Sequence, residues 1–518
     1  MSSQNRPRRG AKAFGSLLTS VAGARVAGNQ LVEVAGLAYD SRRVEPGWVF
    51  VAVRGERNDG HDFVAEAVKR GAVGLVVEAG REAGMSPPPG GAMAVVANSR
   101  EAMAAIARAF YDDPSSKLTL AGVTGTNGKT TTALLIDAIF RAAGHESGVI
   151  GTLEYRIGAR QMRAPHTTPE AIDLQGLLAE MVGEGVTHAA MEVSSHALSL
   201  RRVDGCQFAA AVFTNLTPEH LDFHETMEHY FQAKVRLFDD PQYLPAGGKR
   251  VNAINVDDEA GKLIAARAMG QTLTFGLSQK AHCRAEQIEL GPEGTRFLAV
   301  HPSGRVPVRM KLIGEFNVYN VMGALAACIG MGVEPEVACS AIEEMPPVRG
   351  RFERVPSSKR TVLVDYAHSP DGLRRALETA RRVTRGRVIV VFGCGGDRDR
   401  TKRPVMGELA SRLADRCVIT SDNPRRERPE AIIGEILAGI PKKTRVGCSV
   451  EPDRAKAIRA AIEEAKPEDL VLIAGKGHED YQIFADETIH FDDREVASEV
   501  LREIEGPAPR EVEGWEDG

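Results

Sequence analysis

This sequence of 518 residues lacks three features that would each indicate a particular class of protein. No apolar run approaches the roughly 20 residues that a helix needs to cross a bilayer, so no membrane span is expected. The net charge is −5, and there is no basic excess of the kind that favours nucleic-acid binding. The seven cysteines are scattered without a C-x-x-C pair, which is typical of reduced, mostly buried thiols in the cytoplasm.

The beginning of the chain superficially resembles a secretion signal, because basic residues up to Lys12 precede an apolar stretch. That stretch is short and is interrupted by Gly15, Ser16, Thr19 and Ser20. We therefore do not expect secretion.

The length exceeds what one hydrophobic core can organise and suggests about three domains. Two proline-containing breaks, Asp112-Asp-Pro114 and Met345-Pro-Pro347, are candidate boundaries. The expected domains are residues 1–113, 114–347 and 348–518.

Apolar patterns predict α/β structure throughout. The last part alternates most plainly, which predicts a parallel sheet covered on both faces. Helix 453–465 carries Ala457, Ile458, Ala461 and Ile462 at helical spacing, so we interpret that face as core. Expected strands lie near 49–53, 73–77, 187–193, 209–214, 251–256, 362–366, 388–392, 416–420 and 470–473, with a β-rich segment over 272–312. Expected helices lie near 61–70, 100–110, 317–331, 371–384, 404–414, 429–438 and 453–465.

The ten residues Gly122-Val-Thr-Gly-Thr-Asn-Gly-Lys-Thr-Thr131 join an apolar run, 118–123, to an amphipathic run, 130–143. Strand, glycine-rich turn and helix is the layout that binds nucleotide phosphates, because backbone N–H groups and the helix dipole face the anion. Lys129 supplies a positive charge, and the hydroxyl of Thr130 is suited to ligate Mg²⁺. The segment predicts a nucleotide site with Mg²⁺.

The strict spacing G-x-x-x-x-G-K-[ST] is missed by one residue, because Val123 occupies the position of the first glycine. This departure argues against an ordinary P-loop motor or GTPase. A glycine-rich turn with an incidental lysine is the simpler alternative.

Four expected strands in the last part of the chain end in polar clusters. In an open parallel sheet, ligands bind beyond the carboxyl ends of the strands, so four such clusters favour a binding site. The alternative is that Asp, Asn and Gly only cap the following helices. The clusters are Asp365-Tyr-Ala-His368, Gly393-Cys-Gly-Gly-Asp-Arg-Asp399, Asp422-Asn-Pro-Arg425 and Gly475-Lys-Gly-His-Glu479.

Two strands of the middle part end in the same way, in segments that contain Glu192 and His220. Both are candidate Mg²⁺ ligands alongside Thr130, and the carboxylate is the better-suited type. A histidine in a loop is more often structural, and Lys234 on the next helix would ordinarily be a surface lysine.

Ten motifs in order along the chain resemble those of the Mur ligases of peptidoglycan assembly, in particular the members that add the third amino acid. The resemblance runs from about Asp40 to Glu479, and the ordered set is far more specific than any single motif. The motifs are GVTGTNGKTTT, His166-Thr-Thr-Pro-Glu170, EVSSHAL, NLTPEHLDFH, Gly314-Glu-Phe-Asn-Val-Tyr-Asn320, Gly350-Arg-Phe-Glu353, DYAHSP, GCGGDRD, DNPR and GKGHE.

The resemblance implies an ATP-dependent amide ligase of three α/β domains. The N-terminal domain would bind the UDP part of the substrate. The central domain, a P-loop-type mononucleotide-binding sheet, would bind ATP and Mg²⁺. The C-terminal domain, a Rossmann-like parallel sheet, would bind the incoming amino acid. The implied partners are small molecules with no nucleic acid, and we expect a cytoplasmic monomer.

In the implied reaction, ATP phosphorylates the side-chain carboxylate of D-glutamate in UDP-MurNAc-L-Ala-D-Glu. The amine of meso-diaminopimelate then attacks the acyl phosphate. A carboxylate is a poor acyl donor until its oxygen becomes part of a phosphate leaving group. Making that phosphate requires charge neutralisation by Lys129 and Mg²⁺.

The same resemblance assigns roles to individual residues. Catalysis would rest on Lys129, Glu192, His220 and Lys234, and Mg²⁺ binding on Thr130, Glu192, His220 and Lys234. The ATP site would comprise Gly125, Thr126, Asn127, Gly128, Lys129, Thr130, Thr131, Asn317, Arg351 and Asp365. The UDP-linked substrate would contact Asp40, Ser41, Arg42, Thr167, Thr168, Ser194 and Arg202. Diaminopimelate would contact Arg398, Asp422, Asn423, Pro424, Arg425, Gly475 and Glu479.

Lys234 matches the family lysine that is carbamylated to N6-carboxylysine. Addition of CO₂ to a neutral amine turns a cation into an anion that can support a second Mg²⁺. Because only the deprotonated amine reacts, its surroundings should lower its pKa.

Three positions depart from the family pattern. Leu200 replaces a usual glutamine, so that substrate contact is expected to be lost or replaced. Glu219 replaces a usual aspartate and Glu225 a usual glycine. We expect altered loop geometry there rather than lost activity, since His220 and Lys234 are retained.

The DNPR segment is the family's signature for diaminopimelate, which is lysine with a second carboxylate and its own amine. Arg425 can bind that carboxylate with two parallel hydrogen bonds, and Glu479 can accept the ammonium. With lysine bound, the arginine would be left unpaired at a cost of roughly 1–3 kcal/mol. The alternative is that Arg425 only pairs with a neighbouring acid.

Three other functions remain as alternatives. Two are enzymes, the lysine-adding synthetase and folylpolyglutamate synthase, and the diaminopimelate loop and the UDP-side motifs count against both. The third is a nucleotide-gated binding module without chemistry, which the joint presence of Lys129, Glu192, His220 and Lys234 disfavours.

Overall fold

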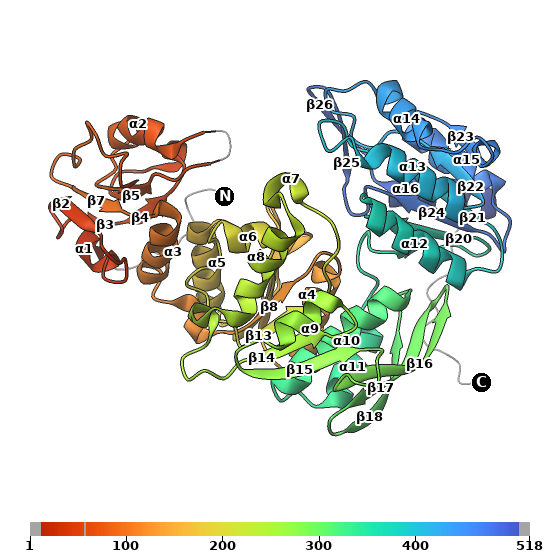
Figure 1. Cartoon of the computed structure of the whole chain (residues 1–518), viewed down its shortest axis with the longest axis horizontal. Coiled ribbons are helices and arrows are strands. Elements are labelled where there is room, and N and C mark those ends of the chain that lie inside the picture. The colour runs from red at the N-terminus through yellow and green to blue at the C-terminus, as the bar shows by residue number, and fades with distance from the viewer. Residues whose placement is uncertain (1–11, 56–57, 507–518) are drawn as a thin grey trace.

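The computed structural model describes residues 12–55 and 58–506. Three α/β regions follow one another along the longest axis of the molecule (Figure 1), each built around its own sheet. This arrangement confirms the expected fold class. The basic residues before Lys12 and the acidic tail after Gly506 lie outside the described residues.

The N-terminal sheet has the strand order β2-β7-β6-β5-β4, with β2 antiparallel and the others parallel. Helices α1 and α3 cover one face and α2 the other. The elements are β2 (Arg25–Gly28), β4 (Gly36–Ala38), β5 (Trp48–Val51), β6 (Gly74–Glu78), β7 (Ala92–Val96), α1 (Phe14–Leu17), α2 (Val64–Lys69) and α3 (Ser99–Phe110); β1 (Lys12–Ala13) pairs with β3 (Glu33–Val34).

The central sheet has eleven strands in the order β11-β10-β9-β12-β8-β13-β14-β15-β16-β17-β18. The seven strands from β9 to β16 in this order are parallel, and antiparallel hairpins extend both edges. The strands are β8 (Thr119–Thr124), β9 (Ser147–Ile150), β10 (Glu154–Ile157), β11 (Arg160–Arg163), β12 (His188–Glu192), β13 (Ala210–Phe213), β14 (Val251–Asn255), β15 (Gln271–Gly276), β16 (Cys283–Gly291), β17 (Gly294–His301) and β18 (Gly304–Met310).

Helices cover both faces of this sheet because its inner strands are apolar on both sides. Helices α4, α10 and α11 pack in one core, and α5, α6, α8 and α9 in the other. The helices are α4 (Lys129–Ala142), α5 (Ala171–Gly183), α6 (Ser195–Ser199), α7 (Leu221–His224), α8 (Met227–Asp239), α9 (Glu259–Ala265), α10 (Glu315–Gly330) and α11 (Pro335–Glu344).

Helix α5 belongs to two cores at once. Leu174 and Leu178 pack into the central core, whereas Ala171, Ile172 and Ala179 pack with α3 of the N-terminal region. A shared apolar contact therefore joins the N-terminal and central regions.

The C-terminal sheet has the order β19-β20-β24-β21-β22-β23, and its five strands from β20 to β23 are parallel. Helices α12, α13 and α14 cover one face, and α15 and α16 the other; the predicted apolar face of α15 is fully buried. The elements are β19 (Glu353–Val355), β20 (Thr361–Asp365), β21 (Val388–Phe392), β22 (Arg416–Ile419), β23 (Cys448–Val450), β24 (Leu470–Ala474), α12 (Pro370–Val383), α13 (Lys402–Leu413), α14 (Pro429–Ala438), α15 (Arg454–Glu464) and α16 (Asp493–Glu505), with a separate hairpin of β25 (Tyr481–Phe484) and β26 (Glu487–His490).

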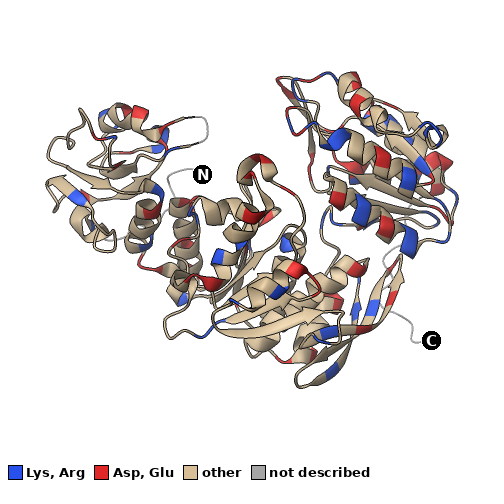
Figure 2. Cartoon of the chain, viewed as in Figure 1, with Lys and Arg blue, Asp and Glu red and all other residues tan. Residues whose placement is uncertain are grey.

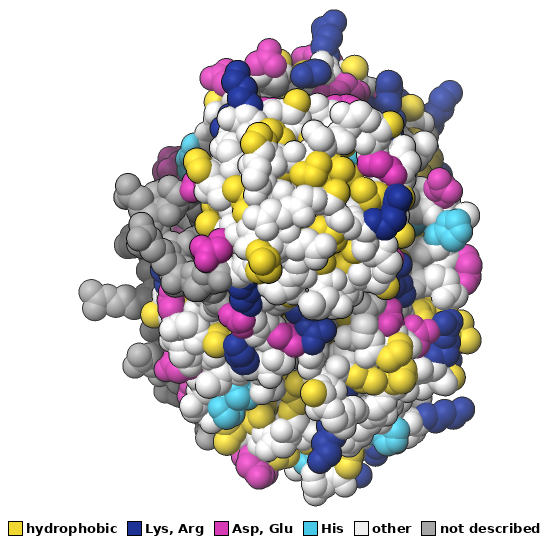
Figure 3. Space-filling model, turned by 90° about the vertical axis from the view of Figure 1, so that its left-hand side faces the viewer, with side chains coloured by type: hydrophobic (Ala, Val, Ile, Leu, Met, Phe, Trp, Pro, Cys, Tyr) yellow, Lys and Arg dark blue, Asp and Glu magenta, His cyan; other side chains and the backbone are white. Residues whose placement is uncertain are grey.

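All seven cysteines are free thiols, and six of them are buried, as predicted. Within the described residues no helix is long and apolar enough to span a bilayer. Basic and acidic residues alternate along the C-terminal helices (Figure 2), and the end of the molecule seen in Figure 3 also mixes both signs with apolar side chains.

Candidate functional site

The glycine-rich loop between β8 and α4, residues 125–128, is the candidate phosphate loop, and it requires glycine at two positions. Gly125 has φ +148° and Gly128 has φ +87°, values that side-chain-bearing residues rarely adopt. A Cβ atom at Gly125 would lie 1.9 Å from Oγ1 of Thr214, and one at Gly128 would lie 2.2 Å from Oδ1 of Asn320. The loop is therefore held against its neighbours at its first and last residues.

Two lysines donate to the same loop carbonyl. Lys129 Nζ lies 3.0 Å from the Gly125 oxygen and 2.7 Å from that of Thr126, and Lys234 Nζ lies 2.8 Å from the Gly125 oxygen. Nζ of Lys234, a residue that is 1% exposed, also lies 4.5 Å from the centroid of the Tyr230 ring. Two lysine amino groups thus meet at one point of the loop.

Burial lowers the pKa of both lysines. For Lys234 the pKa falls well below its ordinary value, because the charge of Lys129 adds to the effect of burial. Glu192 and Glu219 oppose the shift at Lys129, and Glu219 opposes it at Lys234. The surroundings of Lys234 therefore favour the neutral amine.

Glu192 at the end of β12 is fixed by Thr152, whose N–H donates to Oε1 at 2.7 Å and whose hydroxyl donates to Oε2 at 3.2 Å. The hydroxyl of Thr168 donates to the Glu192 carbonyl at 2.8 Å, and the Thr152 and Thr167 hydroxyls lie 3.0 Å apart. These contacts bring the candidate metal ligand and two candidate substrate residues together.

The segment between β13 and α8 carries His220 in a left-handed conformation, with φ +57°. At its end Glu225 has φ +64° and ψ −44°, and Thr226 N–H donates to the His224 carbonyl at 2.7 Å. This is a three-residue turn of the strained kind that glycine adopts most easily. Thr226 then caps α8 by accepting from His229 N–H at 3.2 Å.

Glu219 has contacts that the sequence did not indicate. Its carboxylate lies 4.0 Å from Nε2 of His220 and 3.8 Å from Nε2 of His368, which belongs to the C-terminal region. Burial lowers the pKa of both imidazoles, and the charge of Glu219 opposes this shift. In the sequence Glu219 stood out only as a departure from a family pattern.

Arg351 reaches the phosphate loop from the C-terminal side. Its guanidinium donates to Oγ1 of Thr130 at 3.3 Å and lies 4.7 Å from the centroid of the Tyr366 ring. Nearby, Asp365 accepts from the N–H groups of Phe352 at 2.8 Å and Ala367 at 2.9 Å. Burial raises the pKa of Asp365 to about 6, although Arg351 opposes the shift.

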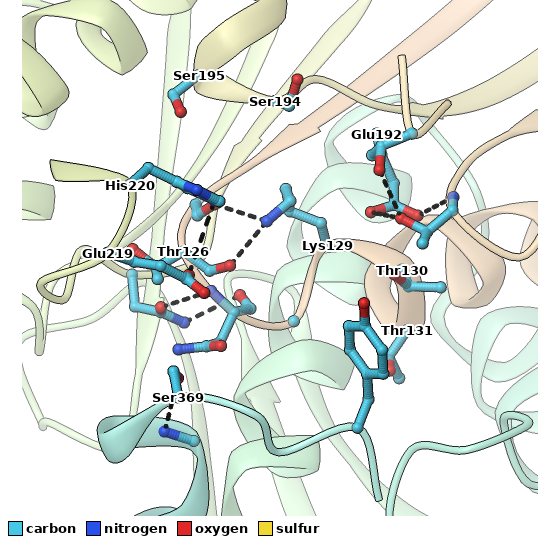
Figure 4. Close-up of a pocket in the computed structure, with 18 of the residues that line it drawn as sticks. Thr126, Lys129, Thr130, Thr131, Glu192, Ser194, Ser195, Glu219, His220 and Ser369 are labelled. Carbon is cyan, nitrogen blue, oxygen red and sulfur yellow. Dashed lines mark hydrogen bonds and ion pairs between the residues drawn. The ribbon is translucent and has the colours of Figure 1, made fainter. Parts of the chain in front are cut away.

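A cavity of about 830 Å³ lies between the central and C-terminal regions, and Figure 4 shows Lys129, Glu192, Glu219 and His220 around it, with Ser369 on the C-terminal side. Its walls contain the four candidate catalytic residues and the candidate phosphate-loop residues. They also contain all four candidate sugar-peptide residues, Thr167, Thr168, Ser194 and Arg202. The predicted residues in these walls are Gly125, Thr126, Asn127, Gly128, Lys129, Thr130, Thr131, Thr167, Thr168, Glu192, Ser194, Arg202, His220, Lys234, Arg351, Asp365 and Arg398.

Asn317 lies outside these walls. It is 1% exposed, donates to the Ile313 carbonyl at 2.9 Å and accepts from Asn320 at 2.9 Å. The side chain that lines the cavity is Asn320, one turn later on α10. A sequence motif containing both residues could not distinguish them.

Asp40, Ser41 and Arg42 also lie apart from this cavity, in the N-terminal region. Asp40 pairs with Arg42 at 2.7 Å, and the Ser41 hydroxyl donates to Glu66 at 2.9 Å. Leu200 lies at the end of α6 and does not line the cavity either.

The remaining candidate acceptor residues gather beyond β22 and β24. Asn423 donates to Glu479 at 2.8 Å, and the buried Lys476, which the sequence analysis did not single out, lies 3.3 Å from the same carboxylate and donates to Asn423 at 3.2 Å. Arg425, with φ +53°, donates to the Gly396 carbonyl at 2.8 Å. This acceptor cluster consists of Asp422, Asn423, Pro424, Arg425, Gly475, Lys476 and Glu479.

Among the residues that the structure describes, no group of three or more His, Cys, Asp or Glu side chains is arranged as a complete metal cage. The carboxylate of Glu192 and the hydroxyl of Thr130 both line the cavity beside the phosphate loop. Mg²⁺ is commonly bound by one or two carboxylates together with substrate phosphates. The donors therefore fit a cation shared with a nucleotide rather than one held by protein alone.

Comparisons with known proteins identify the family of this chain. Profiles of the Mur ligase family, catalytic domain, the Mur ligase middle domain and the Mur ligase, glutamate ligase domain match residues 33–111, 123–328 and 350–477. The chain is 46% identical over 495 residues to UDP-N-acetylmuramoyl-L-alanyl-D-glutamate--2,6-diaminopimelate ligase of Solibacter usitatus, covering 94% of this chain and 98% of the relative.

The protein of the same name from Gloeobacter violaceus is 49% identical over 472 residues, or 91% of this chain and 94% of the relative. A solved structure of a ligase with that name superimposes with a TM-score of 0.70 at 32% identity, covering 96% of this chain and 99% of the other. The protein described here belongs to the Mur ligase family.

Proposed function

We propose that this protein is the ATP-dependent ligase that adds meso-diaminopimelate to UDP-MurNAc-L-Ala-D-Glu in the synthesis of peptidoglycan precursors, the activity named for its relatives. The observation that carries the proposal is that the phosphate loop, the candidate sugar-peptide residues and Arg398 of the C-terminal region all line one cavity. A ligase that passes an activated acid to an amine needs these three groups of residues in one place.

The reaction has two steps. The terminal phosphoryl group of ATP moves to the side-chain carboxylate of D-glutamate, and ADP is released. The amine of diaminopimelate then attacks the acyl carbon, the bond to phosphate breaks, and the amine loses a proton as the amide forms. Lys129 would neutralise the phosphoryl group in the first step, because its half-buried ammonium lies against the loop that would receive the phosphates.

Bound Mg²⁺ would supply further charge neutralisation at the phosphates, held by Thr130 and Glu192 with His220 and a carboxylated Lys234. Thr152 keeps both oxygens of Glu192 in place through its N–H and its hydroxyl. Arg351, which contacts Thr130, and Asp365 would fix the nucleotide from the C-terminal side.

The three regions would divide the substrates between them. Residues 1–113 would bind the uridine diphosphate through Asp40, Ser41 and Arg42, and residues 114–347 would bind ATP. Residues 348–518 would bind diaminopimelate, with Arg425 facing its second carboxylate. Since ATP and UDP-linked precursors are cytoplasmic metabolites, we expect a cytoplasmic enzyme, and we expect it to be a monomer.

An assay of phosphate release from ATP, with UDP-MurNAc-L-Ala-D-Glu present and each candidate amine added in turn, tests the function. We expect release and a new amide product with meso-diaminopimelate, and little of either with L-lysine. Preference for lysine would identify a lysine-adding enzyme, and release without any amine would indicate a plain ATPase. The absence of a new amide with diaminopimelate would overturn the proposal.

Carboxylation of Lys234 has its own test, which does not depend on turnover. With ¹³C-labelled bicarbonate, we expect one slowly exchanging carbamate signal in the NMR spectrum of the folded protein, and its loss in Lys234→Ala. The matched control is Lys262→Ala on α9, an exposed lysine that pairs with Glu259. A spectrum without the signal, or a signal that survives in Lys234→Ala, would contradict the assignment.

A further inference from the structure

Arg403, at the start of α13, is a buried arginine that pairs with two glutamates. Its side chain is 0% exposed. Nη2 donates to Oε1 of Glu427 at 2.7 Å and Nη1 donates to Oε2 at 2.8 Å, so the two side chains share two parallel hydrogen bonds. Nη1 also donates to Oε2 of Glu435 on α14 at 2.9 Å. The guanidinium lowers the pKa of Glu427 to about 2, so this carboxylate is ionised at neutral pH.

The pair of Arg403 and Glu427 holds the loop that follows β21. Nη2 of Arg403 donates to the Gly395 carbonyl at 3.1 Å. The Asp397 N–H donates to Oε1 of Glu427 at 2.7 Å. Asp397 has φ +51°, a left-handed conformation that is uncommon outside glycine and persists where its surroundings hold it. The ion pair therefore contacts this loop at two main-chain groups.

One peptide group connects Glu427 to Arg425. The Gly396 carbonyl and the Asp397 N–H belong to the same planar unit, so they turn together. Its N–H donates to Glu427, and its oxygen accepts from Nη1 of Arg425 at 2.8 Å. A Cβ atom on Gly396 would lie 1.8 Å from the Pro424 oxygen, so the peptide lies directly against the segment that carries Arg425. Glu427 therefore orients the group on which the Arg425 guanidinium rests.

Arg425 is also held at its main chain. Its φ is +53°, and its N–H donates to the Ile483 carbonyl at 3.0 Å. The bond to Gly396 uses Nη1, and Nε and Nη2 form the edge of a guanidinium that a carboxylate can bind with two parallel hydrogen bonds. The direction of this edge depends on the peptide that Glu427 orients.

We propose that Glu427 is a positioning residue for diaminopimelate, which acts through Arg425 by orienting the 396–397 peptide, and that Arg403 holds Glu427 in place. This inference deepens the proposed function and rests on it, because that function assigns the second carboxylate of the amine to Arg425. A guanidinium gives its full advantage only when its N–H groups align with both carboxylate oxygens. A turn of the peptide should therefore weaken binding of diaminopimelate and leave the phosphate loop unaffected.

The first test is Glu427→Gln, with kcat/KM for diaminopimelate and KM for ATP measured separately. The change keeps the size of the side chain, but the amide nitrogen is a donor and would face the N–H groups of Arg403. We expect kcat/KM for diaminopimelate to fall roughly tenfold and KM for ATP to stay within about twofold. Arg403→Lys keeps the charge but loses the two parallel hydrogen bonds, and it should show the same selective loss.

A double-mutant cycle with Arg425→Lys tests the route through Arg425. If Glu427 acts through that guanidinium, Glu427→Gln should lower kcat/KM for diaminopimelate by less than about threefold in the Arg425→Lys background. A further tenfold loss in that background would overturn the inference. An equal rise in KM for ATP, or no loss in Glu427→Gln alone, would overturn it as well.

Glu435→Gln is the matched control, because Glu435 pairs with the side chains of Arg403 and Arg400. Within the described chain its carboxylate makes no hydrogen bond to the 396–397 peptide, so kcat/KM for diaminopimelate should stay within about twofold. A tenfold loss in this variant would show that the ion pairs act only on the fold. Thermal melting shows whether the variants fold. Turnover of the unaltered enzyme with diaminopimelate reports on the proposed function itself, so the two failures are distinguishable.

Discussion

The phosphate loop and the acceptor cluster differ in how their charged groups are satisfied. Lys129 and Lys234 donate to main-chain carbonyls of the loop, and their amino groups share one of these oxygens. In the acceptor cluster, Glu479 is already paired with Lys476 and Asn423, and Arg425 donates to the Gly396 carbonyl. The first region is thus arranged to gain from an anion, whereas the second must exchange internal contacts for ligand contacts.

This difference bears on affinity and on selectivity. A loop whose Lys129 donates to main-chain carbonyls can bind a polyphosphate without first breaking an ion pair. A cluster that is satisfied internally gives up hydrogen bonds to admit a ligand, so an amine that lacks the matching carboxylate leaves a guanidinium unpaired. We therefore expect the phosphate loop to set the rate of activation and the acceptor cluster to select the amine.

Removal of a loop charge should produce the largest effect. Lys129→Met is expected to lower kcat by roughly 10³-fold or more, because it removes a half-buried positive charge beside the loop that would stabilise the transferring phosphoryl group. ADP formation with both substrates present measures it, and Lys262→Met on the exposed face of α9 is the matched control. A loss of less than tenfold would mean that the loop does not depend on this charge.

A change in the acceptor cluster should act on one substrate alone. Arg425→Lys is expected to lower kcat/KM for diaminopimelate roughly 30-fold, because an ammonium cannot replace the two parallel hydrogen bonds of a guanidinium. KM for ATP should stay within about twofold. Arg426→Lys, at the exposed neighbouring position, is the control. An equally large loss in the use of diaminopimelate and of ATP would show that the two regions do not act on separate substrates.

The pH dependence of ATP use should report on Asp365, whose pKa burial raises to about 6. If the ionised carboxylate accepts hydrogen bonds from ATP, KM for ATP should fall roughly tenfold as the pH rises from 5 to 7. The folded state retains this proton above the ordinary pKa of aspartate. The contribution of Asp365 to the free energy of unfolding therefore falls as the pH rises from about 4 to 6.

Asp365→Asn should flatten both profiles, because an amide does not titrate in this range. Kinetics and chemical denaturation across the same pH series measure the two effects. A KM for ATP that still falls through pH 6 in the Asn variant would assign the dependence to another group.

The smallest effect should come from strain in the segment that precedes α8. Glu225→Gly is expected to raise the free energy of unfolding by about 1 kcal/mol or less, because glycine adopts φ +64° more easily but loses more entropy on folding. Activity should change by less than about twofold. Glu228→Gly, three residues on in α8, should instead destabilise the protein by about 1 kcal/mol. Urea denaturation measures the free energy of unfolding of both variants. Changes of the same sign in the two variants would contradict the prediction.

Local sequence predicted which residues around the glycine-rich loop come together in the cavity wall. The order of apolar run, glycines and Lys129 determines the loop by itself, and the C-terminal ends of parallel strands bring Glu192 and His220 near it. The alternation after Gly350 likewise predicted the C-terminal parallel sheet. These predictions succeeded because they depend on neighbours in sequence or on a general rule of sheet topology.

Features that depend on packing between distant segments were not predictable. The spacing on α10 does not tell whether Asn317 or Asn320 faces the phosphate loop, since that follows from how α10 packs on α4. The partners of Glu219 and Lys476 come from elements that only the folded chain brings together. The hairpin β10–β11, the edge strand β23 and helix α16 were missed because they are short or carry many polar residues.

The tight packing of the phosphate loop bears on inhibitor design. A compound that lies against Gly125 and Gly128 would contact residues whose replacement, even by alanine, places a carbon within 2.2 Å of a neighbouring side-chain oxygen. Resistance would then have to arise at the rim, where side chains have room to change. Compounds that bind against Gly125 and Gly128 should consequently select fewer resistant variants than compounds that bind at the rim of the cavity.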